Sequence, residues 1–294
     1  SLAKWKKMKN AGNFPAEDMN QQRALLHRLE AAKEKAQLLA DTFLNEATPI
    51  PTVRALPPTR SEIGRRLQTG EVQTIEDLGG GINDSQVITL KNGERAVWKR
   101  SAGEQSARNG IRPGEYFIRE ALTSDIADVV GMRDLVPETV VRYVGDQIGS
   151  AQRFMDGFDS GVKAGHAGSK TNDVRRSFVM NWILGNTDRH SGNWMVKTRG
   201  ANAGKLGLID NGLNLSTSTV DTPRIWYFRQ LDNLDAEIPD DVKKPWADKW
   251  TDVKQLMTNY GIDPKAIASA EARFNRIMKP GTRWSDFTQD ITER

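Results

Sequence analysis

Apolar side chains recur along residues 15–47 at alternating spacings of four and three, which is typical of a helix with one apolar stripe. The stripe consists of Leu25, Leu29, Ala32, Ala36, Leu39 and Phe43. Because it spans only about three heptads, the stripe predicts either packing onto the rest of the chain or self-association through this helix. Prolines recur at residues 48–60, and since proline interrupts both helices and sheets, we expect a linker there.

From about residue 70 the pattern changes to short β-type segments. Residues 86–90 and 95–99 flank an Asn-Gly pair, which predicts a β-hairpin. The further expected elements are a loop at 101–114, strands at 136–144 and 151–155, helices at 115–130 and 174–184, and mainly helices in the C-terminal third. Strands first and helices later predict an α+β fold.

The composition is that of a globular chain, with 37% hydrophobic and 27% charged residues among 294. No apolar run approaches the ~18 residues of a membrane-spanning helix, so no transmembrane anchor is expected. Cysteine is absent, which excludes disulfides and thiolate metal sites and favours a reducing, cytoplasmic compartment. The formal net charge of +4 is too small to predict specific nucleic-acid binding.

Two short motifs carry candidate chemistry: GNTDRHSGN at residues 185–193 and GLIDNG at 207–212. Phosphoryl transfer needs one carboxylate that orients the attacking hydroxyl, and further oxygens that hold magnesium at the nucleotide phosphates. Asp188 is the candidate for the first role, and Asn193 and Asp210 are the candidate magnesium ligands. The spacing from Asp188 to Asn193 equals that of the kinase catalytic loop, but His190 follows the aspartate instead of preceding it.

With this inversion the two motifs resemble the phosphatidylinositol 3-/4-kinase-like branch of the kinase superfamily, which also includes HipA-type bacterial protein kinases and secreted Fam20-type kinases. The sequence of residues 181–194 is most similar to that of bacterial and phage members, and the resemblance extends over roughly residues 70–215. It implies a two-lobed protein-kinase-like fold with ATP and Mg²⁺ as cofactors, in a bacterial cytoplasm or associated with a virion. The expected domains are an N-terminal helix and linker at 1–60, an N-lobe at 61–151 and a C-lobe at 152–294.

The segment AVWK at residues 96–99 is similar to the kinase strand whose lysine reaches the α- and β-phosphates. Lys99 would then pair with an acid on the following helix. We favour Glu120, because EAL at 120–122 and the later VPET resemble the corresponding family segment. Glu115 is the alternative, on a different side of the helix.

A glycine loop precedes the hairpin, where backbone N–H groups can approach phosphates closely. Its candidate nucleotide contacts are Gly79, Gly80, Gly81, Asn83 and Ser85, although three glycines are also compatible with an ordinary turn. The segment QRFM falls where the family places the strand and hinge that hold adenine. Its candidate contacts are Gln152, Phe154 and Met155, with an ordinary core strand as the other interpretation.

The remaining motif residues are expected to support the reaction. His190 would contact the γ-phosphate or brace the loop, and Arg189 would brace it. Asn211 stands where phosphatidylinositol kinases usually carry Phe, so a Phe-based switch is not expected. Residues 214–229 correspond to the activation loop of the family.

These features predict an ATP- and Mg²⁺-dependent kinase. We favour a protein Ser/Thr substrate over a lipid, because the chain is small and offers no obvious basic amphipathic helix for membrane binding. Two alternatives stay open: transfer of AMP or another group on the same scaffold, and a non-catalytic role as an assembly or virion-associated protein.

Overall fold

The computed structural model describes residues 61–78, 85–104, 110–164, 171–217, 231 and 233–290. The expected helix at 15–47, the linker at 48–60, Gly79 to Gly81, Asn83 and most of the expected activation loop lie outside these residues, so those predictions stay as they are.

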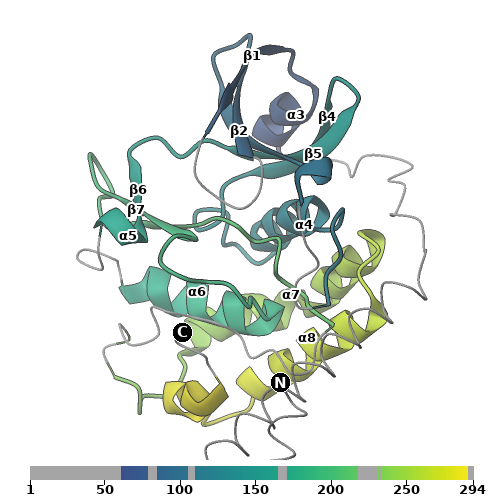
Figure 1. Cartoon of the computed structure of the whole chain (residues 1–294). Coiled ribbons are helices and arrows are strands. Elements are labelled where there is room, and N and C mark those ends of the chain that lie inside the picture. Colours follow the sequence, from purple (N-terminus) through teal and green to yellow (C-terminus); the bar gives the residue numbers. More distant parts are fainter. Residues whose placement is uncertain are drawn as a thin grey trace, which may run out of the picture. The chain divides into compact units, whose positions relative to one another are not determined.

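The first part of the described chain is a five-stranded sheet in which every neighbouring pair is antiparallel, in the order β1-β2-β3-β5-β4 (Figure 1). The strands are β1 (Val72–Asp77), β2 (Ser85–Leu90), β3 (Arg95–Arg100), β4 (Thr139–Val144) and β5 (Gln147–Arg153). A short 3₁₀ helix, η1 (Ser101–Gly103), follows β3. The predicted hairpin is confirmed, because β2 pairs with β3 across the Asn-Gly turn.

The two faces of this sheet are separated by the alternation of side chains along its strands. One face buries Trp98 and Ala151 against Leu67 of helix α3 (Glu62–Thr69). The other face buries Val141 against Phe117 and other residues of helix α4 (Tyr116–Val129). Since Lys99 neighbours Trp98 in β3, its side chain belongs to the α4 face.

Helix α3 is an element that the hydrophobic pattern did not predict. Ser61 begins it as an N-cap, with its hydroxyl accepting from the Gly64 N–H at 2.8 Å. At the other end the buried Arg142 guanidinium of β4 donates to the carbonyls of Leu67 at 2.6 Å and Gly70 at 3.0 Å. A cation at the C-terminal carbonyls complements the helix dipole and ties α3 to the sheet.

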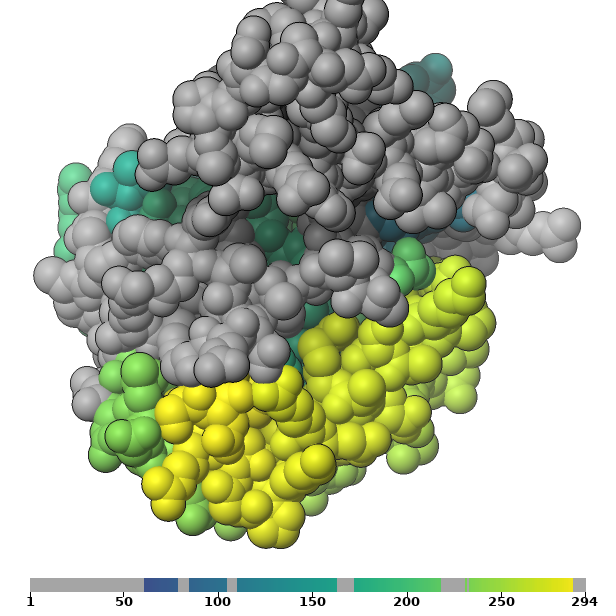
Figure 2. Space-filling view, turned by 60° about the horizontal axis from the view of Figure 1, so that its bottom comes forward, coloured from purple at the N-terminus to yellow at the C-terminus, as the bar shows by residue number. Residues whose placement is uncertain are grey.

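The second part is mainly helical and contains the largest apolar core. A small antiparallel sheet joins β6 (Phe158–Ser160), β7 (Trp194–Lys197) and β8 (Leu206–Leu208), with the short helix α5 (Gly161–Ala164) after β6. The helices are α6 (Thr171–Leu184), α7 (Asp240–Asn259), α8 (Pro264–Ile277) and the 3₁₀ segment η3 (Trp284–Asp290). The C-terminal residues, yellow in Figure 2, gather on one side of that view.

Aromatic side chains build this core. Trp284 lies edge-on to Phe178 of α6, with ring centroids 5.3 Å apart. The ring centroids of Phe287 and Trp182 are 4.4 Å apart. Such pairs each add about 0.5–1.5 kcal/mol beyond their buried area. The core therefore fixes the C-terminal end of α6, from which the motif at 185–193 begins.

The predicted α+β fold is confirmed, and most boundaries differ by only a few residues. Helices α4 and α6 match the expected ranges. The strand expected at 136–144 begins only at Thr139, because Pro137 cannot donate to the sheet. The strand expected at 151–155 begins earlier, at Gln147, and ends at Arg153. Among the described residues no helix combines the length and apolar character needed to cross a bilayer.

Candidate active site

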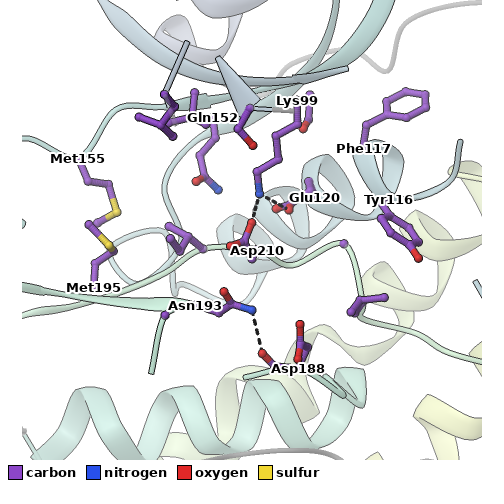
Figure 3. Close-up of a pocket in the computed structure, with 18 of the residues that line it drawn as sticks. Lys99, Tyr116, Phe117, Glu120, Gln152, Met155, Asp188, Asn193, Met195 and Asp210 are labelled. Atoms are coloured by element: carbon purple, nitrogen blue, oxygen red, sulfur yellow. Dashed lines mark hydrogen bonds and ion pairs between the residues drawn. The ribbon is translucent and has the colours of Figure 1, made fainter. Parts of the chain in front are cut away.

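A cavity of about 620 Å³ lies between the five-stranded sheet and the segments that follow β5 (Figure 3). It is lined by residues from β3, α4 and β5 on one side and from the loops around β7 and β8 on the other. Of the predicted site residues, the following line it: Ser85, Lys99, Glu120, Gln152, Phe154, Met155, Asp188, His190, Asn193 and Asp210. The structure thus brings together every predicted site residue that it describes.

Lys99 connects the two sides of the cavity. Its ammonium donates to Glu120 Oε1 at 2.9 Å and forms an ion pair with Asp210 (Figure 3). The second oxygen of Glu120 accepts from the Asn211 backbone N–H at 3.0 Å. Of the two acids considered from sequence, the structure therefore pairs Lys99 with Glu120, while Glu115 pairs with Arg119.

The charges of this cluster stabilise one another. Burial alone would lower the pKa of the Lys99 ammonium, but Asp210 and Glu120 outweigh burial and raise it. Burial alone would likewise raise the pKa of the Asp210 carboxyl, and the nearby Lys99, with Arg189 and His190, outweighs it and lowers the pKa. Both groups are consequently ionised at neutral pH.

Helix α4 is positioned by an internal carboxylate. Glu104 accepts from the backbone N–H groups of Gly114 at 2.5 Å, Tyr116 at 3.1 Å and Phe117 at 3.0 Å, and is only 9% exposed. Burial raises the pKa of this carboxyl, although the N–H donors act in the opposite direction. A negative group at the first turn of α4 is favourable and fixes the direction in which Glu120 points.

The loop after α6 begins with a left-handed turn at Gly185, whose φ is 63°. Buried Asn186 then accepts from the Asp188 N–H at 2.9 Å and donates to the side chain of Asn214 at 2.6 Å. Within this loop, His190 Nε2 lies 3.9 Å from Asp188 Oδ2. The His190 ring also accepts from the Gly192 N–H at 3.0 Å, so this side chain braces the loop.

Asn193 and Asp210 offer oxygen atoms to the cavity. The Asn193 amide nitrogen donates to the Asp188 backbone carbonyl at 2.8 Å, so its carbonyl oxygen is the end left for a ligand (Figure 3). Asp210 adopts a left-handed φ of 54°, and its side chain remains 42% exposed. One amide and one carboxylate oxygen fit a magnesium ion, which usually completes its shell with phosphate oxygens and water.

Arg189 holds the loop at 185–193 and the segment that precedes Asp210 together. Its fully buried guanidinium donates to the backbone carbonyls of Asn193 and Ile209, and to the side-chain oxygens of Asn181 and Asn211. The expected bracing role thus has a structural basis. Asn211 is buried and also donates to the Leu208 carbonyl at 3.2 Å, so its polar side chain belongs to the same hydrogen-bond network.

An apolar slot adjoins the charged cluster. Val97, Met155, Met195 and Ile209 line it, and the thioethers of the two methionines point toward each other (Figure 3). A Cβ atom at Gly207 would overlap with the end of the Met155 side chain, so glycine there leaves room for this methionine. Apolar side chains of this kind commonly line sites for flat aromatic rings.

Val97, Met195 and Ile209 were missed as site residues from sequence. Two of these three residues carried a sequence signal that could have found them. Val97 lies two residues before Lys99 in one strand and so shares its face, and Ile209 immediately precedes Asp210. Glu104 offered no sequence signal, because only the fold brings it to the start of α4.

Comparison with known protein families gives the class of this protein, which is a kinase-type phosphotransferase. Residues 144–245 match the sequence model of the family "Phosphatidylinositol 3- and 4-kinase". This range contains Asp188, Asn193 and Asp210 but does not include Lys99 or Glu120. The chain therefore carries a kinase-type domain, in agreement with the predicted enzyme class.

One curated relative is a phosphatidylinositol 4-kinase gamma 4 of Oryza sativa subsp. japonica, 28% identical over 152 residues. The alignment covers 47% of this chain and 27% of that protein. Among solved structures, the Helicobacter pylori proinflammatory kinase CtkA is similar over 72% of this chain and 93% of its own, with 13% identity and a TM-score of 0.44. The hydra Fam20 structure is similar over 77% of this chain and 90% of its own, with 11% identity and a TM-score of 0.44.

Proposed function

We propose that the chain is an ATP- and magnesium-dependent phosphotransferase that acts on Ser or Thr hydroxyls of proteins. The observation that carries the proposal is the meeting, in one cavity, of the ion-paired Lys99 and Asp210 with the Asp188 carboxylate. The adjoining apolar slot has the character needed for a nucleotide base. The kinase family match over residues 144–245 supports the same reaction class.

Each charged residue has a role in this proposal. Lys99, held by Glu120, would contact the α- and β-phosphates. Asp188 would accept the proton of the attacking hydroxyl, whose oxygen forms a bond to the γ-phosphorus while the bond to the β–γ bridging oxygen breaks and ADP leaves. Asn193 and Asp210 would hold the magnesium ion, which neutralises charge on the phosphate oxygens when bound.

The molecule that accepts the phosphoryl group has two candidates. The rice relative is named as a lipid kinase, so the inositol headgroup is the alternative hydroxyl. We propose a protein hydroxyl, because no basic amphipathic helix that would bring the site to a lipid surface is obvious among the described residues. Both acceptors present an alcohol oxygen, so Asp188 would serve either in the same way.

The test is transfer of label from [γ-³²P]ATP to the chain itself, to added Ser/Thr-containing proteins and to phosphatidylinositol vesicles. We expect wild type to transfer label to protein. In Asp188→Asn the rate of this transfer should fall by about 10²–10⁴-fold, while the affinity for ATP stays within about threefold of wild type. Asp248→Asn is the matched control, because this carboxylate pairs with Lys244 on the surface of α7. Transfer from [α-³²P]ATP alone, or unchanged turnover in Asp188→Asn, would contradict the proposed reaction, and label only in the lipid would contradict the proposed acceptor.

A further inference from the structure

The side chain of Gln152 lies in the cavity wall and is only 5% exposed. Figure 3 shows its amide pointing into the cavity between Met155 and Lys99. The strand pairing accounts for this place, since Val97 is opposite Gln152 and Lys99 is opposite Ser150. Gln152 therefore shares the face of Lys99, two residues further toward the apolar slot.

A chain of hydrogen bonds fixes which end of the amide faces the cavity. The Thr139 hydroxyl donates to the Pro137 carbonyl at 2.9 Å. A hydroxyl has a single proton, so Thr139 can only accept from Gln152, whose Nε2 lies 3.4 Å away. The amide nitrogen is thus directed at Thr139, and Oε1 is directed at the cavity.

Gln152 Oε1 is left as an acceptor on the cavity side. Within the described part of the chain, the contact with Thr139 is the hydrogen bond that the Gln152 side chain makes. An amide oxygen that opens onto the cavity can accept from a ligand that supplies an N–H group at this point. The apolar walls around it are suited to the faces of a ring, which leaves Oε1 to meet a ring edge.

We propose that Gln152 selects 6-aminopurine nucleotides by accepting a hydrogen bond from the exocyclic amine of adenine. The inference rests on the proposed function, because it takes this cavity as the nucleotide site. Adenine presents an amine at position 6, where guanine presents a carbonyl oxygen. A 6-oxopurine would set two acceptors against each other, which weakens its binding by about tenfold or more.

The experiment compares ATP with inosine triphosphate, in which a carbonyl replaces the 6-amine. Calorimetry with magnesium on the full chain gives the ratio of the two dissociation constants. We expect wild type to bind ATP at least about tenfold more tightly. Gln152→Met should weaken the binding of ATP and so bring the ratio of the two dissociation constants toward one. Gln147→Met is the matched control on the same strand, since Gln147 is outside the cavity lining, and should keep the wild-type ratio.

Thr139→Val tests the orientation of the amide without removing it. Valine cannot accept from Gln152, so the amide is free to rotate and present its nitrogen to a 6-carbonyl. Inosine triphosphate should then bind more tightly than it does to wild type, an effect that general loosening of the site would not produce. Thr139→Val also tests the role of Gln152 if circular dichroism shows that Gln152→Met does not fold.

The outcomes separate the two proposals. A wild-type ratio near one, an unchanged ratio in Gln152→Met, or no gain of inosine triphosphate affinity in Thr139→Val would overturn the role of Gln152 and leave the nucleotide site standing. Binding of neither nucleotide by wild type would overturn the proposed function and this inference together.

Discussion

Replacement of Arg189 by Met should destabilise the fold by an amount that follows from its contacts. The guanidinium is fully buried and serves four acceptors, two of them the backbone carbonyls of Asn193 and Ile209. Each buried acceptor left without a donor costs about 1–3 kcal/mol. Removing a buried charge offsets part of that loss. We therefore expect a decrease of about 3 kcal/mol in the free energy of unfolding, out of a typical total of about 5–15 kcal/mol.

Urea denaturation followed by tryptophan fluorescence measures this loss. Arg189→Lys keeps the charge but has only three donors on a flexible stem, so its stability should lie between those of Arg189→Met and wild type. Arg65→Met, on the exposed side of α3, is the control and should change stability by less than about 0.5 kcal/mol. A loss below about 1 kcal/mol in Arg189→Met would refute the reasoning that this side chain joins the two segments.

Three further substitutions test other contacts. Gly149→Ala would place a Cβ atom on the Lys99 backbone carbonyl oxygen, so we expect a loss of about 2 kcal/mol or more in urea denaturation. Lys99→Met removes the charge that lowers the pKa of Asp210. A carboxyl pKa that is lowered in the folded state stabilises the fold above the unfolded-state value, and this benefit is lost as pH falls through the lower folded-state value. The stability gap between wild type and Lys99→Met should therefore narrow as pH falls below about 4. Arg119→Met removes the donor to two buried backbone carbonyls after β8, and hydrogen exchange at residues 213–217 should accelerate; unchanged protection there would contradict this link between α4 and the segment.

Local patterns were enough to predict the elements that have strong sequence periodicity or turn chemistry. The hairpin follows from its Asn-Gly turn, and α6 from its apolar spacing and from the stop at Gly185. Helix α3 was missed because it is short and depends on Arg142, which is distant in sequence and caps its last carbonyls. A local sequence pattern cannot reveal a capping residue that lies 75 positions further along the chain.

The charged part of the cavity could be predicted because its residue types are demanded by the chemistry. The Lys99–Glu120 pair was expected, and the structure shows it at 2.9 Å. The catalytic and metal-binding roles stay predictions. The apolar slot was only partly foreseen, because Val97 and Met195 are ordinary core residue types in sequence. Their place in the cavity depends on strand register and on how the two sheets are arranged.

The division of the charged cluster between distant segments has a practical consequence for anyone who expresses part of this protein. A fragment trimmed to the residues that match the family model, 144–245, would begin at the last residue of β4 and stop inside α7, which runs to Asn259. It would lose Lys99, which neutralises Asp210, and Glu120, which accepts from the Asn211 backbone N–H. It would also cut a helix of the main core. A useful expression boundary must therefore enclose everything from α3 to η3.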